Sequence, residues 1–269
     1  MKKTIPRKTR VLSNRLLDKT GCYRSLQLTG FKPGRKIYPG NFVHLKVTDC
    51  LEPYFRRAFS VADYDSRTDC LEIIYKVVGR GTSLMADYQK GDTVDLIGPL
   101  GNRFTFPGKK KTAMIVAGGV GLPPLFYLSQ QMLAAGHDPD RILFFYGGRS
   151  REDLIRLSHI KKQGVRFYPC TDDGSFGYKG FVTEAVRDHL PDIDRKNIMI
   201  YGCGPEPMLA ALQDLALNEN LAGEISLEAP MPCGVGVCLG CVKPRLDQPG
   251  HYVRVCYEGP VFKMGEVKL

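Results

Sequence analysis

Residues 112–124 read TAMIVAGGVGLPP and decide the fold of the middle of the chain. A short apolar run over 112–117 ends in glycines, and a helical pattern follows over 124–135. A buried strand, a tight turn and an amphipathic helix explain this order. Residues 112–137 contain no Asp, Glu, Lys or Arg. However, glycines and prolines interrupt the run of about 20 apolar residues that a membrane-spanning helix needs, so we expect no membrane segment.

The alternation continues towards the C-terminus. Strand-like runs occur at 142–146, 165–168 and 198–201. Helical patterns near 151–162, 183–190 and 207–218 alternate with them. Strands that alternate with helices of this length predict a parallel sheet with crossover helices. We assign this Rossmann-like α/β domain to residues 108–223.

The part of the chain before this domain has a different pattern. Residues 43–47 and 71–78 are β-branched and alternating in character, and Gly91-Asp92 and Gly98-Pro99 are turn signals. Short strands with frequent turns fit an antiparallel β-barrel. We assign this barrel to residues 1–107.

The part after it, residues 224–269, is rich in glycine and cysteine. Its cysteines are spaced C-x4-C-x2-C-x14-C, at Cys233, Cys238, Cys241 and Cys256. The first three have the plant-type spacing of a [2Fe-2S] site, and the intervening glycines let a loop wrap closely around a cluster. Zinc is the competing ligand, but its usual signature is two separated C-x2-C pairs. We favour an iron–sulfur domain and keep zinc as the alternative.

Composition places the chain among globular proteins of a reducing compartment. It has 269 residues, 43% of them hydrophobic, and a net charge of +10. Nine cysteines without a signal peptide indicate free thiols and a cytoplasmic protein. Five of the first ten residues are Lys or Arg, but no nucleic-acid motif accompanies them. We expect neither nucleic acid nor membrane as a partner, and we expect the five cysteines outside the cluster mostly to be buried.

Two glycine turns follow predicted strands of the α/β domain. Gly118-Gly119-Val120-Gly121 is one, and Gly202-Cys203-Gly204 is the other. Backbone N–H groups at such a turn can approach a pyrophosphate, and the helix that follows favours its negative charge. Ligands of an open α/β sheet bind beyond the carboxyl ends of the strands, so both turns should face one crevice.

Three short motifs together resemble the ferredoxin–NADP reductase superfamily. Arg57-x-Phe59-Ser60 is similar to its flavin motif, residues 119–124 to its pyridine-nucleotide turn, and Cys203-Gly204-Pro205-x-x-Met208 to its Cys-Gly-Pro element. The resemblance implies FAD in the barrel and NAD in the α/β domain, with Cys203 near the nicotinamide as a possible catalytic residue. It implies flavin contacts at Arg57, Ala58, Phe59, Ser60, Ile74, Tyr75, Lys76, Gly81 and Thr82, and dinucleotide contacts at Gly118, Gly119, Gly121, Pro124, Asp172, Cys203 and Gly204.

The C-terminal motif resembles one family within that superfamily. Residues 232–241 and 255–262 are similar to the electron-transfer subunits of NAD-dependent dihydroorotate dehydrogenase, although Ala58-Phe59 departs from their usual flavin motif. The resemblance implies a partner, an FMN-containing dihydroorotate dehydrogenase catalytic subunit, in a heterotetramer of two of each. Electrons from the oxidation of dihydroorotate to orotate would pass through [2Fe-2S] and FAD to NAD+ in pyrimidine biosynthesis.

Two rival functions stay open from the sequence. A related NAD(P)H:ferredoxin-type reductase or sulfhydrogenase subunit shares the three-part plan. The bifurcating NADH-dependent ferredoxin:NADP oxidoreductases tend to have Asp at the first cluster position, and Cys233 argues against them. The other rival is a zinc-binding interaction module without catalysis.

The preference for NAD over NADP depends on an acidic pair after a predicted strand. Asp172 and Asp173 would suit the free 2′-hydroxyl of NAD and repel a 2′-phosphate. Two features oppose this interpretation. Arg149 and Arg151 could supply a cationic pocket, and the acidic pair could simply cap a turn with Gly174. We favour NAD.

Overall fold

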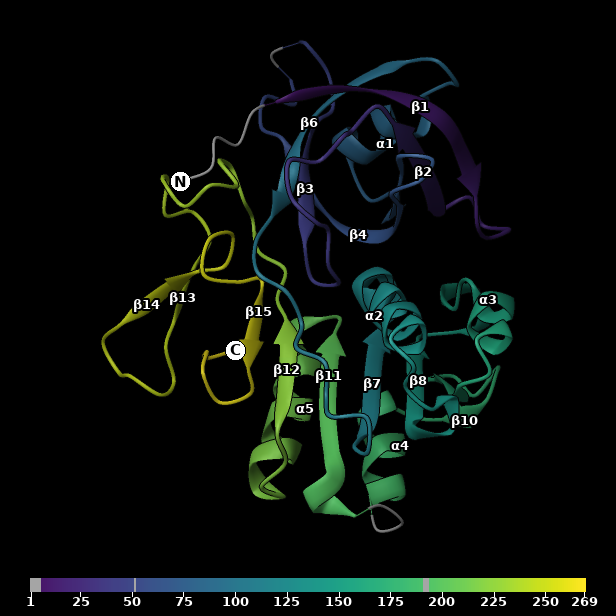
Figure 1. Cartoon of the computed structure of the whole chain (residues 1–269), viewed down its shortest axis with the longest axis vertical. Coiled ribbons are helices and arrows are strands. Elements are labelled where there is room, and N and C mark those ends of the chain that lie inside the picture. The colour runs from purple at the N-terminus through teal and green to yellow at the C-terminus, as the bar shows by residue number, and fades with distance from the viewer. Residues whose placement is uncertain (1–5, 51, 191–193) are drawn as a thin grey trace.

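The computed structural model describes residues 6–50, 52–190 and 194–269. The basic residues Lys2 and Lys3 lie outside the described part. Figure 1 shows a barrel at one end, an α/β sheet with helices at the other, and the C-terminal segment alongside both. In the described ranges, no helix is long and apolar enough to cross a membrane.

The N-terminal part forms the expected antiparallel barrel. Its strands close in the order β1-β2-β5-β4-β3-β6. Their bounds are β1 Arg7–Leu16, β2 Tyr23–Thr29, β3 Phe42–Lys46, β4 Arg57–Asp65, β5 Cys70–Lys76 and β6 Thr93–Leu100, with helix α1 at Arg80–Ala86. Alternate residues such as Val43 and Leu45 point into the barrel core. The opposite face of the same strand is therefore free to contact the rest of the molecule.

The middle part forms a mixed sheet in the order β10-β9-β8-β7-β11-β12-β15, mostly parallel. Its strands are β7 Thr112–Gly118, β8 Ile142–Gly148, β9 Arg166–Thr171, β10 Tyr178–Lys179, β11 Ile198–Cys203, β12 Gly223–Ser226 and β15 Val261–Lys263. The helices are α2 Leu122–Ala134, α3 Leu157–Lys162, α4 Val182–His189 and α5 Glu206–Asn218. Short 3-10 turns occur at Gly119–Gly121, Pro139–Arg141, Arg151–Asp153 and Arg195–Asn197.

Strand β7 is buried on both faces, which explains its unbroken apolar run. Ile115 packs with α2 and α3 on one face. Met114 and Val116 pack with α4 and α5 on the other. A strand covered by helices on both sides needs apolar residues at every position rather than at alternate ones.

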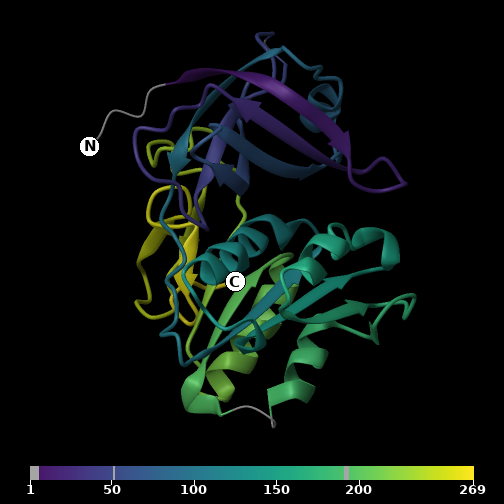
Figure 2. The ribbon, with the colours of Figure 1, turned by 45° about the vertical axis from the view of Figure 1, so that its right-hand side comes forward.

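The C-terminal segment is joined to the sheet rather than standing apart. Strand β15 pairs antiparallel with β12, with Ile225 opposite Phe262. A small hairpin of β13 Val242–Pro244 and β14 Tyr252–Arg254 lies beside it. Asn102, just after the barrel, accepts a hydrogen bond from the Val261 N–H at 2.9 Å and donates to the Val261 carbonyl at 2.7 Å. Figure 2 shows from a second side that this segment lies against both the barrel and the sheet.

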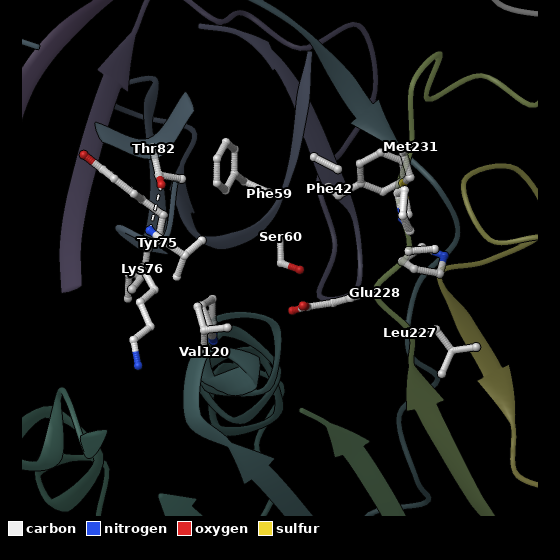
Figure 3. Close-up of a pocket in the computed structure, with 17 residues that line it drawn as sticks. Phe42, Phe59, Ser60, Tyr75, Lys76, Thr82, Val120, Leu227, Glu228 and Met231 are labelled. Atoms are coloured by element: carbon white, nitrogen blue, oxygen red, sulfur yellow. Dashed lines mark hydrogen bonds between the residues drawn. The ribbon is translucent and has the colours of Figure 1, made fainter. Parts of the chain in front are cut away.

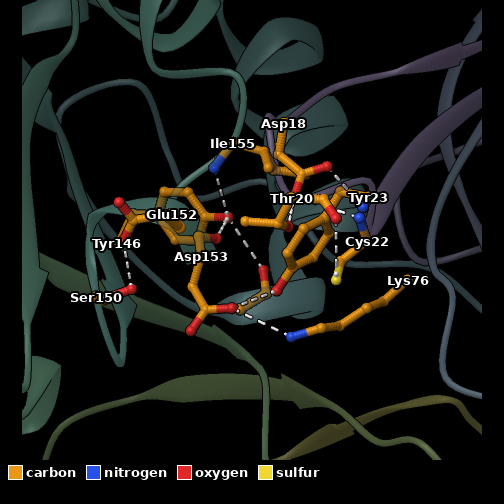
Figure 4. A network of polar contacts seen from close by, with 11 residues as sticks. Asp18, Thr20, Cys22, Tyr23, Lys76, Tyr146, Ser150, Glu152, Asp153 and Ile155 are labelled. Atoms are coloured by element: carbon orange, nitrogen blue, oxygen red, sulfur yellow. Dashed lines mark hydrogen bonds and ion pairs between the residues drawn. The ribbon is translucent and has the colours of Figure 1, made fainter.

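Polar contacts also join the barrel to the α/β domain. The Tyr23 hydroxyl donates to Asp153 Oδ1 at 3.0 Å, and Lys76 Nζ lies 3.1 Å from the same oxygen. Figure 4 shows these side chains converging between the two parts. Nearby, Arg156 forms a buried ion pair with Glu72. Burial acts to raise the pKa of Asp153, but the bonds from Lys76 and Tyr23 outweigh it and hold the pKa below its ordinary value.

We predict that Asp153→Asn weakens the junction between barrel and sheet. The free energy of unfolding at pH 7 should fall by about 1 kcal/mol, because the amide loses the charge-assisted bonds. Folding lowers the pKa of Asp153. The carboxylate therefore stabilises the folded state above the ordinary Asp pKa, and this stabilisation is lost as the pH falls through the lowered, folded-state pKa. Urea unfolding at pH 7 and pH 3 checks both effects. Asp49→Asn, at an exposed ion pair with Lys46, is the matched control and should change stability little.

Candidate functional site

A cavity of about 440 Å³ lies where the three parts of the chain meet. The barrel, the start of α2 and residues 227–231 all contribute to its wall (Figure 3). Seven of the residues expected to contact flavin line it: Ala58, Phe59, Ser60, Ile74, Tyr75, Lys76 and Thr82. The cavity thus gathers residues from two strands and a helix that are separated in sequence. Its largely apolar wall with a few polar groups is typical of a cofactor site.

The other two expected flavin residues lie together beside this cavity. The Arg57 guanidinium packs against Gly81, where a Cβ would come within 3.2 Å of its Nε. In the described chain, no carboxylate lies within ion-pair distance of Arg57. Thr82 Oγ1 accepts hydrogen bonds from the N–H groups of Val78 and Gly79. The guanidinium thus has no carboxylate partner among the described residues, although its Nη1 donates to the Phe55 carbonyl at 2.6 Å. Its remaining N–H groups, beside a glycine turn, suit a phosphate group, which Arg can bind in a bidentate manner.

The two glycine turns of the α/β domain pack directly against each other. A Cβ on Gly121 would lie 2.3 Å from the Cys203 carbonyl oxygen, and one on Gly118 would lie 2.5 Å from Met208 Sδ. Gly204 likewise lies close to the Gly118 backbone. Close packing between the turns therefore explains these glycines. Gly119 differs because it has a φ of +51° and a Cβ there would meet nothing within 4 Å, so it faces open space.

The remaining dinucleotide residues are placed as follows. Pro124 is buried in the first turn of α2, and it is Pro123 that lines the cavity. Asp172 follows β9, at the same carboxyl edge of the sheet as the two glycine turns. The Asp173 carboxylate accepts bonds from the Ser175 N–H and hydroxyl, at 2.9 and 2.6 Å. Asp173 thus caps the turn, whereas the described residues include no hydrogen-bond donor to the Asp172 carboxylate; both residues are exposed. Partial loss of solvent around the Asp172 carboxylate raises its pKa, and this effect outweighs the lowering effect of the Arg149 charge.

Glu228 is an ionisable residue in the cavity that the sequence patterns did not single out. Figure 3 shows its carboxyl group pointing into the cavity on the side of Ser60. Surrounding protein raises the pKa of Glu228. Cys203, 1% exposed, lies near enough for the Glu228 charge to raise its thiol pKa further, after the larger effect of burial. An acidic residue two positions after the buried strand β12, at the carboxyl edge of the sheet, is the signal that could have revealed Glu228.

The four cluster cysteines form two pairs. Cys241 Sγ and Cys256 Sγ are 3.2 Å apart, and Cys233 is hydrogen-bonded to the Cys238 N–H and thiol. Burial acts to raise the pKa of Cys233, but the backbone N–H groups of residues 238, 235 and 237 outweigh it and lower the pKa to about 6. Within the described residues, no three His, Cys, Asp or Glu side chains converge on one point. Two thiol pairs fit two irons better than the four-ligand cage of one zinc.

The loop that carries these thiols needs glycine at two positions. Gly234 and Gly236 have φ values of +69° and +81°, which L-residues rarely adopt. A Cβ on Gly236 would lie 2.9 Å from Tyr257, and one on Gly234 would lie 2.6 Å from the His44 ring. His44 is a barrel residue and is fully buried. The cluster loop therefore packs directly on the barrel.

Comparison with known families agrees with this three-part organisation. Residues 115–214 match the oxidoreductase NAD-binding domain, and residues 228–268 match the iron-sulfur cluster binding domain of dihydroorotate dehydrogenase B. Among solved structures, an NADH-dependent reduced ferredoxin-NADP oxidoreductase has a TM-score of 0.83 at 24% identity, over 100% of this chain and 91% of the other. A ferredoxin reductase of carbazole 1,9a-dioxygenase has a TM-score of 0.69 at 23% identity, over 81% and 66%. The chain has the ferredoxin-reductase fold with an added iron–sulfur domain, which defines a class of oxidoreductases.

Relatives narrow this class further. A Bacillus velezensis protein named dihydroorotate dehydrogenase B (NAD(+)), electron transfer subunit, is 39% identical, over 86% of this chain and 87% of its own length. A Caldanaerobacter subterraneus protein of the same name is 37% identical over 97% of both chains. This chain belongs to the family of electron transfer subunits of dihydroorotate dehydrogenase B. The expected family and fold class are confirmed.

We predict that Arg57→Ala weakens FAD binding. Loss of a charge-assisted bond to phosphate should raise the dissociation constant of FAD about 10- to 100-fold. Flavin fluorescence on dilution, or titration of the flavin-free protein with FAD, measures this change. Arg80→Ala is the matched control, because Arg80 lies next to Gly81 at the start of α1 but is paired with Glu52. Equal FAD affinity in the two variants would contradict the placement of the phosphate beside Arg57.

Proposed function

We propose that this chain transfers electrons from a dihydroorotate-oxidising partner to NAD+ in pyrimidine biosynthesis. The supporting observation is the position of the 440 Å³ cavity. Its wall includes Val120 and Pro123 from the dinucleotide turn on one side, and Met231 and Pro260 from the cluster segment on the other. A flavin held there would lie between an electron donor and a hydride acceptor.

The cofactors of this function are FAD in the barrel cavity, a [2Fe-2S] cluster on the four cysteines, and NAD at the crevice beside the glycine turns. When bound, the cluster exchanges single electrons and the flavin exchanges a hydride with the nicotinamide. The residues of the chain bind and orient these groups. Arg57, Gly81 and Thr82 would hold the FAD pyrophosphate, and Ser60 would donate its hydroxyl hydrogen to the ring system.

Cys203 and Glu228 would shape the nicotinamide side of the cavity. Both have raised pKa values, so the Cys203 thiol keeps its proton and Glu228 retains one more readily than an ordinary Glu does. A neutral thiol packs against a planar ring without repelling it. The Glu228 carboxyl group, on the Ser60 side of the cavity, could hold a proton beside a bound flavin.

The partner would be an FMN-containing catalytic subunit, two copies joining two copies of this chain, docked over the cluster loop. The loop exposes apolar side chains, with Val237 78% and Leu239 57% exposed. Tyr54 and Phe55 of the barrel are also exposed, 69% and 54%, and line a second cavity with Cys233. Exposed apolar side chains on the loop that carries the redox centre and on the nearby barrel suit a protein interface that excludes water.

We keep the proposed division into residues 1–107, 108–223 and 224–269. The second boundary falls at the start of β12, which also pairs with β15 from the third part. We also propose a cytoplasmic location, because none of the nine cysteines, all in the described part of the chain, forms a disulfide and a cluster of this kind is stable in a reducing compartment.

The function is tested with the chain and its partner together. Co-expression with a dihydroorotate-oxidising subunit, followed by affinity purification, should yield a complex that reduces NAD+ when dihydroorotate is added. The partner alone should reduce artificial acceptors but not NAD+. Dihydroorotate-dependent NAD+ reduction at the same rate without this chain would refute the proposal.

We predict that Ser in place of Cys233, Cys238, Cys241 or Cys256 removes or severely depletes the cluster. Each cysteine supplies one of the thiolates that two irons need. Iron and sulfide content, and the absorption spectrum of protein purified without oxygen, give the measurement. Cys22→Ser and Cys50→Ser should retain full iron content. A colourless protein that binds zinc would instead support the interaction-module alternative.

We predict a preference for NADH over NADPH that depends on Asp172. In Asp172→Ala, the kcat/KM for NADH divided by that for NADPH should fall by about tenfold. The negative carboxylate no longer repels the negative 2′-phosphate of NADPH. Diaphorase kinetics with an artificial acceptor measure this ratio. Asp173→Ala should change it less, since that carboxylate is bound to Ser175. A wild-type preference for NADPH would overturn the choice of NAD.

A further inference from the structure

One face of strand β3 runs from the flavin cavity to the cluster loop. Phe42 lines the flavin cavity. Lys46, four residues later, lines a second cavity of about 390 Å³ that also includes Cys233. Alternate residues of a strand share a face, so His44 lies between these two positions on the same face. Val43 and Leu45 point the other way, into the barrel core.

The imidazole of His44 is enclosed and unpaired. Its side chain is 0% exposed, and in the described residues neither ring nitrogen has a hydrogen-bond partner of acceptable geometry. The backbone of Met231 and Arg56 approaches the ring closely enough to act on its pKa, but not in the geometry of a full hydrogen bond. The other buried histidine, His137, has both ring nitrogens within 3.0 Å of carbonyl oxygens. Buried polar groups are almost always paired, so the unpaired state of His44 needs a physical reason.

The ring lies directly against the backbone of the cluster loop. A Cβ on Gly234 would be 2.6 Å from His44 Nδ1 and 2.9 Å from Cε1. Gly234 follows Cys233, whose sulfur already accepts backbone N–H groups from three residues of the loop. The loop itself therefore supplies backbone N–H donors to the Cys233 sulfur. The His44 ring faces the same loop from the barrel.

We propose that His44 is a positioning residue whose ring N–H donates a hydrogen bond to a sulfur of the cluster at the Cys233 end. This inference rests on the proposed [2Fe-2S] cluster and adds the group that the barrel contributes to it. A donor to a cluster sulfur stabilises the reduced, more negative state and raises the reduction potential. His44 thereby tunes the electron step between the cluster and the flavin cavity, which its strand also lines.

The reduction potential of the cluster tests this role. In His44→Phe the ring shape is retained but the donor is lost, so the potential should become more negative. A tenfold change in the reduction equilibrium constant is about 59 mV for one electron. His44→Asn keeps a donor and should restore part of the shift. His251→Phe, in the exposed hairpin region of the same segment, is the control and should leave the potential unchanged.

A titration of the full chain, followed by EPR of the reduced cluster, gives these potentials, and iron content is measured in parallel. Full iron content with an unchanged potential in His44→Phe would overturn the inference but not the cluster. Equal shifts in the Phe and Asn variants would also overturn it, because packing alone would then explain them. A wild-type protein without iron would refute the proposed function instead.

A second measurement uses the wild-type protein, so it does not depend on whether the His44 variants fold. Wild-type protein labelled with ¹⁵N-histidine should show, in pulsed EPR of the reduced cluster, a ¹⁵N nucleus coupled through the hydrogen bond. The same coupling should persist in His251→Phe. No ¹⁵N coupling beyond that of distant nuclei would overturn the proposal, even if the His44 variants fail to hold the cluster.

Discussion

The antiparallel pairing of β15 with β12 is the constraint on which the functional arrangement depends. β12 is an inner strand of the sheet, and its carboxyl end leads into Leu227 and Glu228 at the flavin cavity. β15 lies just after Cys256 and Pro260, so its register with β12 fixes where the last thiol sits. Asn102 adds a second attachment, from the linker that leaves the barrel. Without this pairing, the cysteine segment would be a tethered appendage rather than one wall of a cavity.

Polar contacts join the parts on one side of the molecule, and on the other side apolar packing accompanies the hydrogen bonds of Asn102. Tyr23, Lys76 and Asp153 join barrel and sheet near the dinucleotide side, whereas Phe42 packs with Cys241, Cys256 and Phe262 near the cluster. A hydrogen-bonded junction fixes orientation, and an apolar junction excludes water from a redox path. Each kind of contact thus suits the chemistry beside it.

The sequence predicted most of the elements but few of the contacts between them. Residues 112–117 and 198–201 could be recognised as strands because a strand buried on both faces has an unbroken apolar run. The segment 151–162 was predicted as one helical pattern, yet a 3-10 turn and Arg156, with φ of +58°, precede the six-residue α3. Arg156 is held there by its ion pair with Glu72 of the barrel, a long-range contact that local patterns do not contain.

Some residues of the candidate site could be predicted from the sequence, and others became visible only in the structure. The cysteines could be found from their spacing, and the flavin motif is a local string that could be found from its resemblance to a known family. Glu228 and His44 are single residues whose surroundings come from distant segments, and neither belongs to a recognisable motif. Only the place of Glu228 just after a buried strand hinted at a role. The pairing of β12 with β15 was also absent from the prediction, because a three-residue strand has too short a pattern to specify a partner.

The order of segments along the chain has a consequence for biosynthesis. β15 comes after all four cysteines, whereas the barrel and the first six strands of the sheet precede them. A ribosome therefore releases the flavin-binding and dinucleotide-binding parts before the closing strand exists, and these parts can fold first. Until β15 exists, the segment with the four thiols lacks its pairing with β12 and is not yet fixed against the sheet.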